Sequence, residues 1–194
     1  MNQSKITANK QGARRTSPTI RITLTAVFMA LNIAMCSFGI PVPGGHLYLC
    51  DVIICLAALL LSPYEAFVVG GIGAFLGDLI FYPLPMFVSL VTHGLQAVVI
   101  SLISHHTFQK HQKVASIIAV TVGAVIMVVG YTLGKTFVYS TFEYAMVKLP
   151  YEIAQGTIGA VFGVLLAEVL GIRKLYDNVV LGHSKKHTVE PQEN

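Results

Sequence analysis

Ionisable and amide side chains recur inside otherwise apolar stretches of this sequence, and they are the residues that could carry chemistry. The set is Asp51, Asp78, His93, Gln96, Tyr131, Lys135, Glu152 and Gln155. A charged side chain at the centre of a membrane span costs about 2.5–3.5 kcal/mol on insertion scales, so such residues tend to mark function. Ligand pockets combine aromatic walls with a few placed polar groups. The set is therefore predicted to bind a small polar solute.

The charged members also have a purely structural interpretation. Asp51 and Asp78 could cap helix ends or extend toward the membrane surface. Lys135 could serve only as the partner of Asp78 or Glu152, because buried charges usually pair. Both interpretations stay open for each residue, and the set is more informative than any member.

The aromatic members have structural alternatives too. His93 on an apolar face could be a structural histidine, although Gln96 lies one turn later on the same face and favours binding. Tyr131 could belong to an interfacial aromatic belt.

Motifs for catalysis, metals or cofactors are missing from the sequence. The cysteines Cys36, Cys50 and Cys55 match no zinc or redox spacing. The sequence contains no H-E-x-x-H, no serine-nucleophile motif and no phosphate-binding G-x-x-x-x-G-K-[ST]. We therefore predict no metal, no cofactor and no enzymatic activity in this chain.

Hydropathy predicts the elements that position the polar set. The chain has 194 residues, 54% hydrophobic and 11% charged, with a mean hydropathy of +0.69, whereas soluble domains carry about 25% charge. A spanning helix needs about 20 apolar residues. Six such helices are predicted, over about 19–38, 47–61, 64–80, 86–104, 114–138 and 150–170. The predicted fold class is an all-α membrane protein, with one compact bundle at 19–172 between polar tails at 1–18 and 173–194.

The distribution of basic residues predicts the orientation. With the amino terminus in the cytoplasm, 11 of the 13 Lys and Arg residues fall on the inner side, as the positive-inside rule requires. Both tails are then cytoplasmic, and the basic amino-terminal arm sets topology rather than contacting nucleic acid. In this orientation the polar set lies in the outer halves of five helices. The inner halves are apolar except for Glu168, so the sequence predicts a polar site that opens outward and is closed below.

Two further stretches have distinct patterns. Ala26, Ala30 and Ala34 form one face of small residues on the first helix, a pattern that permits close helix contact in membranes. The face serves either internal packing or, if external, a partner protein. The segment 39–45, rich in Gly and Pro, breaks the chain after this helix.

At these residues the sequence resembles the substrate-binding S component of an energy-coupling factor (ECF) vitamin transporter. The resemblance covers about residues 20–172. It rests on the alanine face of the first helix, on residues 44–61, on the glycine-rich stretch 70–78 and on residues 150–166. The riboflavin- and pyridoxine-type members are the most similar.

The resemblance implies a mechanism. An S component binds a vitamin at its outer face in a bacterial plasma membrane, and a membrane coupling subunit grips the alanine face. Two cytoplasmic ATPase subunits then drive toppling of the S component, which carries the vitamin inward. The loop around the site, with Pro43, Gly44, Gly45 and His46, would act as its gate.

Two departures from the family pattern lie near the expected site. His93-Gly94 stands where relatives often have Lys-Gly, and Cys50-Asp51 where many have Gly-Asp. We favour a pyridoxine-like or hydroxymethylpyrimidine-like ligand, with cobalamin, pantothenate, riboflavin and queuosine precursors left open. The alternatives in function are a stand-alone transporter or channel and an intramembrane enzyme that uses Asp51, Asp78 and His93.

Overall fold

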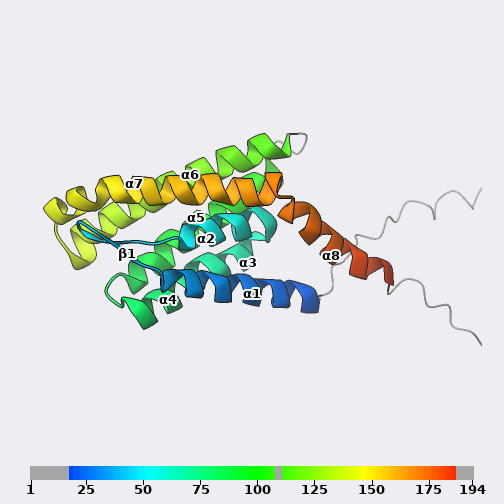
Figure 1. Cartoon of the computed structure of the whole chain (residues 1–194), viewed down its shortest axis with the longest axis horizontal. Helices are drawn as coiled ribbons and strands as arrows, with labels where there is room; N and C mark the ends of the chain where they lie inside the picture. The colour runs from blue at the N-terminus through cyan, green and yellow to red at the C-terminus, as the bar shows by residue number, and fades with distance from the viewer. Residues whose placement is uncertain (1–17, 108–110, 187–194) are drawn as a thin grey trace, which may run out of the picture.

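The computed structural model describes residues 18–107 and 111–186, and nearly all of them are helical. The helices lie roughly side by side in one bundle (Figure 1). They are α1 (Pro18–Cys36), α2 (Cys50–Leu60), α3 (Pro63–Phe67), α4 (Gly73–Phe81), α5 (Met86–His106), α6 (Gln112–Gly134), α7 (Phe142–Val164) and α8 (Ile172–Lys186). Three short π-helical segments, η1 (Val68–Ile72), η2 (Lys135–Tyr139) and η3 (Leu165–Val169), join α3 to α4 and extend α6 and α7. The all-α fold class is confirmed.

Five helical stretches in the described residues are long and apolar enough to cross a membrane. They are Pro18–Cys36, Pro63–Phe81, Met86–His106, Gln112–Tyr139 and Phe142–Val169. The remaining apolar helix, α2, has 11 residues, which span about 16 Å, roughly half the thickness of a bilayer core. The count of six spans stays a prediction, because α2 is too short to cross by itself.

The predicted start of the second helix at Leu47 is wrong, because the preceding residues pair as a hairpin. Strands β1 (Ile40–Val42) and β2 (Gly45–Leu47) run antiparallel, with Val42 opposite Gly45. Pro43 and Gly44 form the two-residue turn, and Gly44 has a φ of 83°. A proline followed by a residue of positive φ is the requirement of a type II turn. Helix α2 can begin only after this pairing ends.

The predicted start of the last helix at Pro150 is also wrong. Helix α7 begins at Phe142, and Thr141 caps it by accepting a hydrogen bond from the Tyr144 backbone N–H at 3.4 Å. Pro150 lies inside the helix, which membrane helices tolerate because neighbouring groups satisfy the freed backbone carbonyl. The predicted loop at 139–149 is therefore mostly helix, and its Lys148 becomes part of the bundle interior.

The carboxyl-terminal segment differs from a simple polar tail. Residues Ile172–Lys186 form α8, which projects from the end of the bundle opposite the hairpin (Figure 1). We call these two ends the hairpin end and the α8 end. The predicted tail at 1–18 lies outside the described residues except for Pro18, which opens α1.

Helix α2 is the centre of the bundle, and glycines on α7 let the two helices approach closely. Nine of the 11 residues of α2 are buried. A Cβ at Gly159 would lie 2.5 Å from Asp51 Cβ and 3.1 Å from the Asp51 backbone carbon. A Cβ at Gly163 would lie 2.7 Å from Cys55 Cβ. The absence of side chains at these two positions sets the depth of Asp51 relative to α7.

This contact gives a matched test of packing. Gly159→Ala is expected to lower stability by about 1–3 kcal/mol, the usual cost of overpacking, because the new methyl group meets backbone as well as side chain. Gly156→Ala on the same helix is the control, since its nearest neighbours would lie at an ordinary 3.4 Å. Thermal unfolding in detergent compares the two variants. Equal melting temperatures would contradict the close α2–α7 packing.

An apolar layer fills the bundle between Asp51 and the α8 end. It contains the buried residues Ile54, Leu56, Leu59, Leu60, Ala66, Ala97, Ile100, Ala119, Val120 and Ala167. Outside, large apolar residues are exposed on every long helix, including Ile22, Val91, Val125 and Phe162. Exposed apolar surface of this extent marks a lipid or protein contact. The bundle thus has an apolar interior layer and an apolar surface.

Candidate ligand-binding site

A cavity of about 150 Å³ opens at the hairpin end of the bundle. Of the predicted site residues, Asp78, His93, Tyr131, Lys135, Glu152 and Gln155 line it. Asp51 and Gln96 do not line it and lie one layer deeper. Gly44, Gly45 and His46 of the hairpin also line it. The structure therefore brings together residues from α4, α5, α6, η2 and α7 that are far apart in the sequence.

Asp51 is the centre of a hydrogen-bonded network beneath the cavity. The Gln96 amide N–H donates to Asp51 Oδ1 at 3.1 Å, and the Gln155 amide N–H donates to Asp51 Oδ2 at 2.6 Å. Gln155 Oε1 in turn accepts from the Tyr48 backbone N–H at 3.0 Å. The carboxylate, only 1% exposed, thus holds α2, α5 and α7 together and connects them to the end of the hairpin.

His93 joins this network through Gln96. Its Nδ1 lies 2.7 Å from Gln96 Oε1. Because the Gln96 amide nitrogen donates to Asp51, its oxygen is left to accept, which places the ring proton on His93 Nδ1. In the neutral ring the Nε2 atom is then an acceptor. The His93 ring packs edge-on against Tyr131, with centroids 5.2 Å apart.

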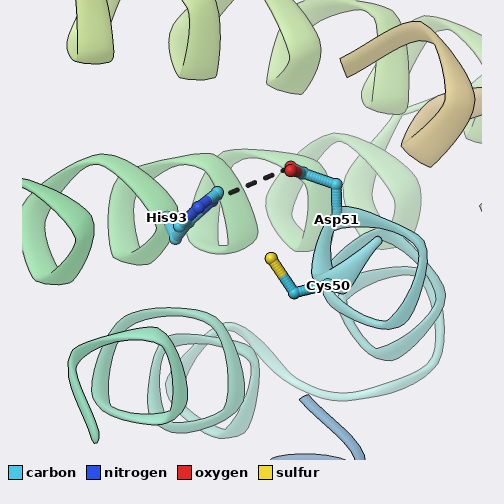
Figure 2. A group of neighbouring side chains, drawn as sticks. All are labelled: Cys50, Asp51 and His93. Carbon is cyan, nitrogen blue, oxygen red and sulfur yellow. Dashed lines mark ion pairs between the residues drawn. The ribbon is translucent and has the colours of Figure 1, made fainter. Parts of the chain in front are cut away.

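Cys50, Asp51 and His93 offer three possible metal ligand atoms within 4.8 Å of one another. Figure 2 shows the three side chains converging from α2 and α5. Asp51 Oδ1 lies 3.8 Å from His93 Nδ1. Both Asp51 oxygens and His93 Nδ1 already have hydrogen-bond partners in Gln96 and Gln155. We interpret the group as part of the hydrogen-bonded network, and the expectation of no metal stays a prediction.

A second network lies in the wall of the cavity. Ser89 Oγ donates to Asp78 Oδ2, and Tyr131 Oη lies 2.5 Å from the same Ser89 oxygen. Because the Ser89 hydroxyl donates its one proton to the carboxylate, Tyr131 is the donor in the second hydrogen bond. Asp78 is 7% exposed, and its second oxygen has no protein donor within the described residues. That oxygen is available to a ligand.

Two lysines share one carboxylate on the third wall. Lys135 Nζ donates to Glu152 Oε1 at 2.6 Å, and Lys148 Nζ lies 3.9 Å from the same oxygen. All three side chains are at least nine-tenths buried. Lys135 Nζ also lies over the rings of Tyr131 and Tyr139, at 5.4 Å and 5.6 Å from their centroids. Of its two possible partners, Lys135 therefore pairs with Glu152.

The hairpin covers the cavity and rests on Lys148. A Cβ at Gly44 would lie 2.7 Å from Lys148 Cβ, so only glycine allows this contact. His46 packs near Tyr48 and Tyr82, with ring centroids 6.0 Å and 5.5 Å away. Burial raises the pKa of the Tyr48 phenol well above its usual value, so it stays protonated at neutral pH. Of the predicted gate residues, Pro43 forms the turn but does not line the cavity.

Sequence reasoning missed several cavity residues. Lys148 and the tyrosines Tyr48, Tyr82 and Tyr139 all line the cavity. A helix start at Pro150 leaves Lys148 in the preceding loop, whereas the structure places it inside α7. A signal was available in its spacing, since Lys148 and Glu152 are four residues apart and so share a helix face.

The alanine face of α1 is external. Ala26, Ala30 and Ala34 are exposed, whereas the buried positions of α1 are Thr25, Asn32 and Cys36. Large apolar residues flank the face, among them Ile22, Val27 and Leu31. Internal packing, one of the two interpretations of this pattern, is therefore excluded within the described bundle.

Glu168 is the one acidic residue predicted in the apolar inner halves of the helices, and its charge is neutralised by an ion pair with Arg173. Arg173 lies 2.8 Å from Glu168 Oε1, and Ser116 Oγ donates to the same oxygen at 2.7 Å. Near the same end Arg21 pairs with Glu65 at 2.6 Å. The charged groups of the α8 end thus pair with one another rather than continuing the cavity downward.

Comparison with known proteins places these features in a family. Residues 17–172 match the family described as "ECF-type riboflavin transporter, S component". A protein of Pyrococcus woesei, described as an uncharacterized protein in gap 3'region, is 27% identical over 143 residues, which cover 73% of this chain and 94% of that protein. The family match spans most of the chain and includes every element that lines the cavity. The chain therefore belongs to the family of S components of ECF-type transporters, multi-pass membrane proteins that bind substrate for transport.

Proposed function

We propose that this chain captures a small water-soluble vitamin in the cavity at the hairpin end and that this end faces the exterior. The observation that carries the proposal is a polar cavity at one end of the bundle, closed beneath by the apolar layer around Ile54 and Ile100. A solute can enter such a site but meets no polar path to the other side. Passage therefore needs movement of the whole subunit, and the arrangement favours a carrier subunit over a stand-alone channel.

The size of the cavity favours a ligand with a single ring. A cavity of 150 Å³ holds a benzene-sized molecule, and this cavity has that volume. A pyridoxine-like or hydroxymethylpyrimidine-like ring fits this description. The three fused rings of riboflavin, the vitamin in the family's description, and the still larger cobalamin need more room. We therefore place this chain among the S components for single-ring vitamins.

The lining residues suggest separate roles. The free oxygen of Asp78 accepts a ring N–H or hydroxyl, and His93 Nε2 accepts a second donor from the ligand. Tyr131, Tyr139 and Tyr48 supply aromatic walls. Asp51, Gln96 and Gln155 act from below by fixing the position of His93 and the hairpin.

The distribution of basic residues supports the orientation. Arg21, Lys113, Arg173 and Lys174 lie toward the α8 end, whereas Lys135 and Lys148 at the hairpin end are buried. By the positive-inside rule we infer that the α8 end faces the cytoplasm of a bacterial cell, with both termini on that side. The exposed alanine face of α1 is the docking surface for a transmembrane coupling subunit. Two cytoplasmic ATPase subunits complete the importer, so ATP hydrolysis occurs in the partners.

The hairpin is proposed to gate the site. It contacts the bundle through Gly44 on Lys148, the Tyr48 backbone N–H on Gln155 and the packing of His46 on Tyr82. These contacts are few, which suits an element that must open. Release of the hairpin would expose the lysine wall, formed by Lys135 and Lys148, and the tyrosines that line the cavity to a ligand.

Co-expression tests the proposal directly. The tagged chain, produced with the coupling and ATPase subunits of an ECF module, is expected to purify as a complex, and mass spectrometry of the denatured protein should show a single-ring vitamin. A chain bearing Asp78→Asn should retain the partners and lose the vitamin. Uptake by the chain alone in liposomes, or failure to copurify with the ATPases, would contradict the proposal.

A further inference from the structure

Lys148 is a buried cation whose donors are not used by the protein. Its side chain is 10% exposed, and its nearest acidic partner is Glu152 Oε1 at 3.9 Å. That distance is too long for a hydrogen bond, and Lys148 Nζ forms none within residues 18–107 and 111–186. Glu152 Oε1 already accepts from Lys135 at 2.6 Å. The ammonium group of Lys148 therefore remains available at the cavity wall.

Hydrogen bonding on this wall is uneven. Lys135 and Lys148 face one carboxylate, that of Glu152. A buried charge is costly unless it is paired and hydrogen-bonded. The other acidic group that lines the cavity, Asp78, interacts with Lys148 only through space, and its Oδ2 accepts from Ser89. Within the described residues, Lys148 thus has two carboxylates nearby but donates a hydrogen bond to neither of them.

The hairpin fixes the ammonium group toward the cavity. The backbone and Cβ of Lys148 pack against Gly44, and Lys148 Nζ would lie 3.7 Å from a Cβ at Gly45. The stem is held between α7 and the hairpin tip, so the charged end has little freedom to reach the bulk solvent. Its remaining direction is into the space that a ligand would occupy.

We propose that the ligand of this chain carries an anionic oxygen on its ring and that Lys148 binds this oxygen when the hairpin is closed. The inference rests on the proposed function and narrows it to anionic rings. A ring carboxylate and a ring phenolate present the same chemistry to the ammonium group. Lys148 is then a specificity-determining residue, while Asp78 and His93 contact the uncharged parts of the ring.

Two matched ligand pairs test this inference by isothermal titration calorimetry on the purified full chain. Pyridine-3-carboxylate and pyridine-3-carboxamide differ by one negative charge at constant shape. Pyridoxine has a phenolate in its zwitterionic form at neutral pH, whereas 4-amino-5-hydroxymethyl-2-methylpyrimidine has no anionic oxygen. The anionic member of at least one pair is expected to bind about tenfold or more tighter, as charge-assisted hydrogen bonds do. The pair that shows the difference distinguishes carboxylate from phenolate.

Substitution at Lys148 links the preference to this residue. Lys148→Met keeps the length and packing of the stem, and it is expected to reduce the preference within the responsive pair to less than about threefold. Lys148→Arg retains the charge and should retain most of the preference. Lys113→Met at the α8 end is the control for loss of a lysine elsewhere.

Each outcome decides the inference. Equal affinity of the charged and neutral rings for the wild-type chain overturns it and leaves the proposed function intact, because a single-ring ligand still binds. Binding of none of the four rings overturns both. A preference that survives Lys148→Met shows that another group binds the anion. The comparison of rings on the wild-type chain keeps the test valid even if Lys148→Met does not fold.

Discussion

Ala30→Leu is expected to reduce vitamin uptake by roughly tenfold to a hundredfold while ligand binding to the isolated chain stays within about twofold. The reason is geometric. Ala30 is exposed at the centre of the alanine face, and small residues in a membrane interface allow two helix backbones to approach closely. A leucine there would overpack the contact with the coupling subunit by about 1–3 kcal/mol. The cavity lies on the other side of α1 and is not touched.

Two variants control this prediction in assays of tracer uptake and ligand binding. Ala154→Leu introduces the same group at an exposed alanine of α7, outside the proposed docking face, and uptake should be preserved. His93→Ala is the reciprocal change, which should weaken ligand binding and leave copurification with the module unchanged. If Ala30→Leu and His93→Ala lose the same property, the separation of docking face and binding site is wrong.

The polar site could be predicted from sequence because the bilayer leaves few alternatives for charged groups. Asp78, His93 and Glu152 interrupt apolar helices at similar depth, and helices that run side by side bring equal depths together. Since ionisable groups in membranes avoid lipid and pair with one another, their convergence follows from pattern alone. The pairing of Lys135 with Glu152 rather than Asp78 does not follow. It depends on the rotation of α6 about its axis, which hydropathy does not fix.

The cover of the cavity could not be predicted by the same reasoning. The hairpin depends on a register of three residues per strand, and a Gly-Pro stretch is equally compatible with an irregular loop. The sequence places Lys148 in a loop because proline at a helix start and proline inside a membrane helix give the same local signal. Thr141, a residue with the side chain of a helix N-cap, marks the true start of α7. The sequence contains many other threonines, so residue type alone does not identify Thr141 as the helix cap.

Glu152→Gln is expected to destabilise the folded chain by about 3–5 kcal/mol, the usual effect of removing one partner of a buried ion pair. Glu152 is 1% exposed and lies 2.6 Å from Lys135 and 3.9 Å from Lys148. The substitution leaves both ammonium groups without the carboxylate that they share in a largely buried site. Thermal unfolding in detergent should show a large fall in the melting temperature.

A second substitution distinguishes charge imbalance from simple loss of packing. Lys135→Met in the Glu152→Gln background removes one of the two uncompensated cations and is expected to restore much of the lost stability. Additive destabilisation by the two changes would show that the pair contributes packing rather than charge balance. An anionic ring should also stabilise Glu152→Gln more than it stabilises the wild-type chain, because the ligand would supply the missing negative charge beside Lys148. Glu152 would then both stabilise the lysine pair and set the charge that the site accepts, since it accepts a hydrogen bond from Lys135 and leaves Lys148 for the ligand.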